Sequence, residues 1–203
     1  MSKMLLKDNY FSLIDPALKD GSVDSGYIRD YPPGIRENGA QYNHAALWAV
    51  QSYSDIGNID DAEILLKLIN PIERSRTEEK ALAYGIEPYA VASDIYGGRH
   101  AGRGGWSWYS GSAGLMYTTI LEHILGVRRN GATLSVLPRV PKGMKEAVIT
   151  LPCGKVSYRV TIRNPKGIHS EVLSVFRDNI KCDPLRIPFV DDGADHQIEV
   201  ALG

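Results

Sequence analysis

Three side chains able to do ionic or acid–base chemistry lie close together early in the sequence. In the stretch YPPGIRENGAQYNHAALW (residues 31–48), Arg36 and Glu37 come shortly before His44. A cation, a carboxylate and an imidazole beside a helix N-terminus form a polar corner that can accept an anion, because free backbone N–H groups gather there. The alternative is a surface helix on which Arg36 and Glu37 pair with each other, since short motifs often occur by chance.

The helix that must position His44 is predicted to run from about Ala40 to Ser54. The Pro-Pro-Gly turn upstream cannot continue a helix. Asn38 is the predicted N-cap, and Gln41 is the predicted polar partner of a capping box. Apolar residues then recur at helical spacing and predict the buried face of the helix, which consists of Tyr42, Ala45, Ala46, Ala49 and Tyr53.

A second helix start follows a glycine-rich segment. Gly97–Gly105 contains five glycines in nine residues, so its backbone can approach another group closely. No Gly-Lys-Ser/Thr follows, which excludes a Walker A loop, and no dinucleotide-binding fingerprint follows a strand here. Ser110 is predicted to cap a helix that ends at Gly126. The small residues around Ser110 either leave room for a ligand or permit close helix packing.

The remaining pattern predicts an α+β protein, with helices first and strands afterwards. A helix beginning at Asn58 or Asp60 ends at Asn70, because Pro71 disfavours helix at the residue before it. A short helix is predicted for Tyr89–Ile95. From about Gly131 the period changes, and six short β-type segments follow: Ala132–Leu137, Glu146–Leu151, Lys155–Ile162, Glu171–Phe176, Arg186–Val190 and His196–Leu202. Six short strands favour an antiparallel sandwich.

Composition narrows the classes of function. The chain has 203 residues and a formal net charge of −1, with no basic block, so neither nucleic acid nor an anionic membrane is an expected partner. Cys153 and Cys182 have no metal-type spacing and suit a reducing compartment. The N-terminus lacks the apolar run of a signal peptide, and no stretch is long enough to span a membrane. A cytoplasmic protein is expected.

Four motifs in order carry a resemblance to a known family: YPPGIRENGAQYNHAALW, INPIERSRT, EPYAVASDIY and GRGGWSWYSGSAGLMY. Together they resemble the C-terminal part of the inverting glycoside phosphorylases of glycoside hydrolase family 94. That family includes cellobiose, chitobiose and β-1,2-oligoglucan phosphorylases and the phosphorylase-like region of cyclic β-1,2-glucan synthetase. The motif PPGIRENGAQY is most similar to the corresponding sequence in the β-1,2-glucan branch. The resemblance covers about residues 10–165.

The resemblance implies a fold. Members of the family have an α/α barrel of helical hairpins followed by a C-terminal β-domain. Residues 1–130 would then form the closing helices of an α/α six-hairpin barrel, and residues 131–203 a C-terminal antiparallel β-sandwich domain.

The resemblance also implies roles for individual residues. It assigns phosphate binding to His44, Ser110 and Gly111, and substrate binding to Arg36, Glu37 and Gln41. The chain departs from the family pattern at Asn43 and Ser110, where threonine is usual, although Ser110 keeps a hydroxyl. Ser93 stands near a position where disaccharide phosphorylases often have a sugar-binding glutamine, so the substrate is left open.

The implied chemistry is phosphorolysis of a β-linked glucose oligosaccharide. An inverting glycosidase needs a carboxylic acid and a base that activates water. Inorganic phosphate is already a nucleophile, so a phosphate site replaces the base, and phosphate is a co-substrate with no other cofactor or metal expected. The family takes its general acid from an Asp-Trp-Asn-Asp-type motif upstream of this region, and these 203 residues contain no such motif. We therefore expect no catalytic residue here and no activity of the chain alone.

Two other interpretations remain open. The β-half is a carbohydrate-binding module if aromatic side chains are exposed on one sheet face, or the chain is a structural remnant without catalysis. Because barrel helices bury their faces against neighbours, the expected partners are the missing N-terminal part of the enzyme or a second copy of the chain.

Overall fold

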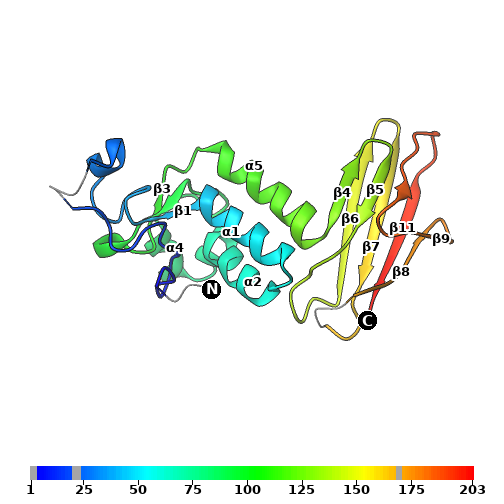
Figure 1. The fold of residues 1–203 in the computed structure, drawn as a ribbon, viewed down its shortest axis with the longest axis horizontal. Helices are drawn as coiled ribbons and strands as arrows, with labels where there is room; N and C mark the ends of the chain where they lie inside the picture. Colours follow the sequence, from blue (N-terminus) through cyan, green and yellow to red (C-terminus); the bar gives the residue numbers. More distant parts are fainter. Residues whose placement is uncertain (1–3, 20–23, 168–170) are drawn as a thin grey trace. The chain divides into compact units, whose positions relative to one another are not determined.

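The computed structural model describes residues 4–19, 24–167 and 171–203, and the chain divides into two compact units, Met1–Tyr117 and Thr118–Gly203 (Figure 1). Both helix and strand are present, which is compatible with the α+β class. No helix in the described ranges is both long and apolar enough to cross a membrane.

Short helices and loops make up most of the first unit. Helices α1 and α2 follow each other directly and pack side by side (Figure 1). The helical segments are η1 (Gly26–Asp30), α1 (Asn43–Asp55), α2 (Ile59–Ile69), α3 (Pro71–Arg74), α4 (Glu78–Tyr84), η2 (Gly98–His100) and α5 (Ser110–Thr118).

The capping residue and the proline in the sequence correctly predicted where α2 begins and ends. The side chain of Asn58 accepts a hydrogen bond from the Asp61 N–H at the start of α2. The helix ends before Pro71, as predicted, and Asn70 there accepts from the Ile72 N–H to start α3. Asx side chains cap helices because they satisfy backbone donors that have no partner within the helix.

Several local predictions were wrong, among them the buried face of α1, where Ala46 alone of the predicted residues is buried. Asn38 does not cap α1, because its side chain bonds instead to the backbone of Leu18 and Tyr31. Helix α1 begins later, at Asn43, after the extended residue Tyr42. No helix forms at Tyr89–Ile95, where the described chain turns and then enters a strand.

A small three-stranded sheet joins segments that are distant in sequence. Its strands are β1 (Gln41–Tyr42), β2 (Asp94–Ile95) and β3 (Gly104–Gly105), in the order β1-β2-β3. Both outer strands are antiparallel to β2, so β1 and β3 run in the same direction. Helix α1 follows β1 directly and α5 follows β3 after a short loop. The two helices therefore start from the same end of the sheet.

The glycine-rich segment packs backbone against backbone, which confirms the close approach expected of it. Gly97 N–H donates to Gly34 O at 2.8 Å. A Cβ on Gly34 would lie 2.8 Å from Gly97 O, and one on Gly97 would lie 2.9 Å from Gly39 O. Any side chain at these positions would push the two loops apart.

The second unit begins with the π-helical turn η3 (Thr119–Ile124) and continues into two sheets. One sheet has the order β10-β5-β4 and the other β6-β7-β11-β8-β9. The strands are β4 (Val127–Asn130), β5 (Thr133–Val136), β6 (Glu146–Cys153), β7 (Val156–Arg163), β8 (Val172–Arg177), β9 (Ile180–Cys182), β10 (Ile187–Pro188) and β11 (His196–Leu202).

One hydrophobic core receives side chains from both of these sheets. Leu134 and Ile187 come from the smaller sheet, and Val160 and Ile198 from the larger one. Along β7 and β11 buried and exposed residues alternate, as expected when one face of each strand packs on a core. A purely antiparallel sheet was predicted. The larger sheet differs from this prediction, because β11 pairs parallel to β7.

Gly126 ends the helical segment and is expected to tolerate no side chain. Its φ is +69°, and a Cβ there would overlap the carbonyl of Leu137. Gly131 has a similar φ of +61° but open space around it. We predict that Gly131→Ala costs about 1–2 kcal/mol for the left-handed backbone alone. Gly126→Ala should cost about 1–3 kcal/mol more, because the neighbouring backbone must move.

Urea unfolding followed by circular dichroism measures both costs, with the wild-type chain as reference. Equal destabilisation by the two alanine variants would contradict the predicted overlap at Gly126.

Candidate functional site

The guanidinium of Arg36 lies at the centre of the candidate site. The residue has a left-handed φ of +47° and is 7% exposed. Its backbone N–H donates to Asp94 Oδ2 at 2.9 Å. Asp94 is in β2 and is fully buried, so the sheet fixes the backbone of the Arg36 loop. Left-handed non-glycine residues of this kind cluster at ligand-binding and active sites.

Four aromatic rings surround this guanidinium. The Arg36 Cζ atom lies 4.6 Å from the ring centre of Trp106, 5.5 Å from Tyr109, 5.7 Å from Tyr42 and 5.8 Å from Tyr31. A cation over an aromatic face is attracted by the ring quadrupole, by up to about 2 kcal/mol where water is excluded. Trp106 and Tyr109 remain about half exposed, so a ligand can still reach them.

Two carboxylates, those of Glu37 and Asp94, interact electrostatically with the positive charge of Arg36. Glu37 Oε2 lies 3.7 Å from Arg36 Nε, close enough for an ion pair but too far for a hydrogen bond. Burial lowers the pKa of Arg36, but Glu37 and Asp94 more than offset this and the pKa is raised overall. For Asp94, burial raises the pKa above its ordinary value, against the opposing effects of the Arg36 N–H and charge.

Several buried polar atoms of this cluster make no hydrogen bond to any described residue. They are Arg36 Nε and Nη1, Glu37 Oε2 and Asp94 Oδ1. Buried polar groups are normally hydrogen-bonded, and each one left without a partner costs about 1–3 kcal/mol. Such a cluster does not maximise stability, and it is the kind of exception found at functional sites.

Both helix starts approach Arg36. Tyr42 immediately precedes α1 and Tyr109 immediately precedes α5, and both rings contact the Arg36 guanidinium. The parallel course of β1 and β3 accounts for this arrangement, because each strand leads into one of the helices. The free N–H groups of two helix N-termini thus lie near one buried cation.

The residues predicted to bind phosphate lie at these helix starts. His44 is the second residue of α1, is half-buried, and its ring packs edge-on against Trp48 with centres 5.1 Å apart. Ser110 begins α5, as predicted for the helix start, and is exposed. Gly111 follows it, and a Cβ there would meet no atom within 4 Å.

Gln41, predicted to bind substrate, is fully buried in β1. Its Oε1 accepts from the Phe11 N–H at 2.8 Å. Its Nε2 donates to Asn43 Oδ1 at 2.7 Å and to Leu68 O at 3.1 Å. The amide is therefore occupied by the protein itself, and its capping-box role is wrong because Gln41 lies before the helix.

Asp94 was missed by the sequence analysis. A lone carboxylate in the otherwise uncharged stretch AVASDIY was the available signal, since acids are seldom buried without a partner. A Cβ on Gly105, opposite Asp94 in β3, would lie 2.7 Å from Asp94 Oδ1. The last glycine of the glycine-rich segment therefore makes room for this carboxylate.

Among its described residues, the second unit shows no exposed aromatic face of the kind expected of a carbohydrate-binding module. Tyr158 is fully buried, stacks on Phe189 and donates its hydroxyl to Val190 O. Among the described residues of this unit, the large apolar side chains that are exposed are all aliphatic: Val148, Leu173, Ile180 and Leu185.

Comparison with known proteins supports the resemblance seen in the motifs. Residues 1–126 match the model of the glycosyl hydrolase 94 superfamily, catalytic domain. The cyclic beta-(1,2)-glucan synthase NdvB of Rhizobium meliloti is 38% identical over 164 residues, 80% of this chain. The N,N'-diacetylchitobiose phosphorylase of Vibrio proteolyticus is 29% identical over 93% of this chain, and the solabiose phosphorylase of Paenibacillus borealis is 23% identical over 93%.

These relatives are much longer than the chain. The matched region is 6% of the glucan synthase and 23% and 24% of the two phosphorylases. The family match spans more than half of this chain and includes both helix starts and the Arg36 loop. The chain therefore belongs to the glycosyl hydrolase 94 superfamily, and the candidate site lies within the part that matches the family's catalytic domain.

Proposed function

We propose that the chain is the C-terminal part of a carbohydrate phosphorylase. The complete enzyme cleaves a β-glucosidic bond with inorganic phosphate and inverts the configuration to give an α-sugar 1-phosphate. The observation that carries the proposal is the contact of the Arg36 guanidinium with the residues that begin two helices. Sugar-binding and phosphate-binding groups then belong to a single site.

The sugar side of the site consists of Arg36 and Glu37. Their buried polar atoms without partners match the hydroxyl groups of a sugar, which both donate and accept hydrogen bonds. The half-exposed rings of Trp106 and Tyr109 offer apolar faces of the kind that pack against a pyranose ring. Asp94 and Gln41 act as positioning residues, because Asp94 holds the Arg36 backbone and Gln41 ties β1 to neighbouring segments.

The phosphate side consists of the starts of α1 and α5. Helix N-termini bind anions through free N–H groups and the positive end of the helix dipole. His44 adds an imidazole, Ser110 a hydroxyl, and the open space around Gly111 allows an oxyanion to approach the backbone.

In the proposed reaction a phosphate oxygen attacks the anomeric carbon from the face opposite the leaving group. The glycosidic C–O bond breaks, and the leaving oxygen takes a proton from a general acid. These 203 residues contain no Asp-Trp-Asn-Asp-type motif that would supply the acid. The products are an α-sugar 1-phosphate and the shortened saccharide. The names of two relatives, a cyclic beta-(1,2)-glucan synthase and a chitobiose phosphorylase, favour a β-linked oligosaccharide as substrate.

The proposed family role also implies how the two parts of the chain belong to the complete enzyme. The helices of the first unit close an α/α six-hairpin barrel, and the second unit, which includes β4 and the predicted domain 131–203, is the C-terminal β-sandwich. Helix faces of such a barrel pack against further hairpins, so the partner is the remainder of the enzyme or a second copy of the chain.

Sugar binding is predicted to depend on Glu37. Titrating sophorose, a β-1,2-linked disaccharide, into the chain should shift the indole NMR signal of Trp106. Glu37→Gln should weaken this binding about tenfold or more, because a hydrogen bond to a charged group contributes about 1.5–3 kcal/mol. Glu63→Gln is the matched control, since Glu63 pairs with Lys67 along α2. Equal affinities of these two variants would contradict the role of Glu37.

Phosphate binding is predicted to depend on the hydroxyl of Ser110 and the ring of His44. Ser110→Ala and His44→Ala should each weaken phosphate binding about tenfold, whereas Ser110→Thr keeps the hydroxyl and stays close to wild type. The backbone amide shift of Gly111 reports binding at this place. Ser52→Ala serves as a control because Ser52 is an exposed helix serine that bonds to Trp48 O. Unchanged Gly111 titrations in both alanine variants would refute the phosphate site.

The chain alone is predicted not to catalyse phosphorolysis. Proton transfer to the leaving group typically contributes about 10²–10⁴-fold to the rate, and the general acid is not among these residues. Purified chain is mixed with phosphate and sophorose, cellobiose or laminaribiose, and glucose 1-phosphate is assayed beside a full-length phosphorylase of the family. Turnover above about 1 s⁻¹, within the ordinary enzymatic range, would show that the acid lies within the chain.

A further inference from the structure

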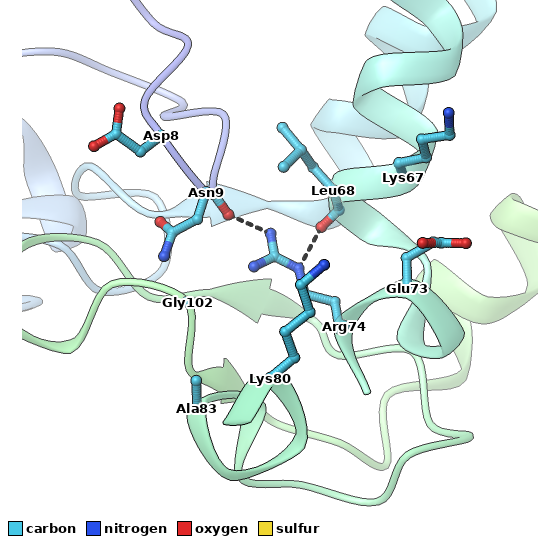
Figure 2. A pocket seen from close by; sticks show the side chains of 9 residues that line it. All are labelled: Asp8, Asn9, Lys67, Leu68, Glu73, Arg74, Lys80, Ala83 and Gly102. Atoms are coloured by element: carbon cyan, nitrogen blue, oxygen red, sulfur yellow. Dashed lines mark hydrogen bonds between the residues drawn. The ribbon is translucent and has the colours of Figure 1, made fainter. Parts of the chain in front are cut away.

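A separate pocket of about 350 Å³ lies in the first unit, away from the Arg36 loop. It is formed by the N-terminal segment, the end of α2, helices α3 and α4, and the loop at Gly102 (Figure 2). Its volume is within the range of small-molecule sites. None of the residues assigned above to sugar or phosphate lines it.

Arg74 lies at the centre of this pocket (Figure 2). Its Nε donates to Leu68 O at 2.7 Å and its Nη2 to Asn9 O at 2.5 Å. Both acceptors are neutral carbonyls, and no carboxylate of the described chain pairs with this guanidinium. Nη1 makes no hydrogen bond to the described residues. Burial lowers the pKa of Arg74 to about 10, which reflects a positive charge without compensation.

Lys80, an exposed residue of α4, supplies a second cation. It extends from α4 towards Arg74 in Figure 2, and its ammonium pairs with no acid among the described residues. The other charged residues nearby differ in this respect. Lys67 pairs with Glu63 at 2.5 Å, and Glu73 pairs with Arg76 at 2.5 Å. Arg74 and the exposed Lys80 are therefore two cations without an ion-pair partner, and Asp8 is the one lining carboxylate that is not already paired within the described chain.

The rest of the lining is suited to a polar, uncharged body. The carboxylate of Asp8 can accept hydrogen bonds from hydroxyl groups, and the amide of Asn9 can both donate and accept. Leu68 and Ala83 add apolar surface. A free inorganic anion would leave most of this volume and these groups unused.

We propose that this pocket binds a phosphorylated monosaccharide, with its phosphoryl group on Arg74 and Lys80 and its hydroxyl groups on Asp8 and Asn9. A phosphoryl group carries up to two negative charges and three acceptor oxygens, which match one guanidinium and one ammonium. The sugar hydroxyls account for the carboxylate and the amide. The inference rests on the pocket alone and does not depend on the proposed phosphorolysis.

The test is a titration of the wild-type chain with glucose 1-phosphate, followed by the backbone amide shifts of Gly102 and Ala83. Glucose 6-phosphate, inorganic phosphate and glucose are titrated in parallel. We expect binding of at least one sugar phosphate, weaker binding of phosphate, and none of glucose. The two sugar phosphates distinguish the position of the phosphoryl group.

Variants separate this pocket from the other anion site. Lys80→Gln should weaken glucose phosphate binding about tenfold or more, because it removes a charged hydrogen-bond donor. Lys67→Gln, which removes an already paired charge beside the same pocket, should change it by less than about twofold. Ser110→Ala should leave the Gly102 and Ala83 titrations unchanged. Arg74 is not substituted in this test. It also joins the backbone at Leu68 to that at Asn9, so a change in binding by Arg74→Gln would not distinguish a lost ligand contact from a disturbed structure.

Three results would overturn the proposal. Absence of shifts at Gly102 and Ala83 with millimolar sugar phosphate would show that the pocket is not a ligand site. Equal affinities of Lys80→Gln and Lys67→Gln would remove the role of the second cation. Glucose binding as tightly as its phosphates would show that charge does not govern recognition.

Discussion

The buried charge of Arg36 is the constraint on which the site region depends. A guanidinium that is withdrawn from water must be compensated by opposite charge or by polarisable neighbours. Glu37 and Asp94 provide the carboxylates, and four aromatic rings provide the surrounding faces. These groups come from the Arg36 loop itself, from β1, from β2 and from the segment between β3 and α5. The position of one side chain therefore accounts for the arrangement of several short elements that have little core of their own.

The backbone around this cation is held by close approaches that only glycine permits. The loop of Arg36 touches the glycine-rich segment at Gly34 and Gly97, and Gly105 makes room for Asp94. The sheet that links them has only two residues in each strand. Strands this short contribute few hydrogen bonds, so the buried ion cluster and the glycine contacts must help to hold them together. The residues proposed to bind ligands thus also help to hold this part of the structure together.

The sequence predicted elements whose signals are local. Strand β11 was placed at His196–Leu202 because apolar residues alternate there, and α2 because Asn58 caps it and Pro71 ends it. The short strands β4 and β9 were missed because neither has a full alternating pattern. Asn38 was misassigned because a capping side chain can equally bond to a distant backbone, here that of Leu18. The role of Asp94 could not be predicted, since it depends on pairing between segments 58 residues apart.

The π-helical turn Thr119–Ile124 has a consequence for sequence change in the family. Its hydrogen bond from Leu125 N–H to Ile120 O spans one residue more than an α-helical bond. The extra residue changes the angle between the side chains before and after it by about 100° about the helix axis, and in this arrangement Leu121 and Leu125 both pack against the core of the second unit. Deleting one residue here would restore an ordinary α-helix while turning those leucines away from that core. Insertions and deletions should therefore be rarer in this turn than in the exposed loops that follow it.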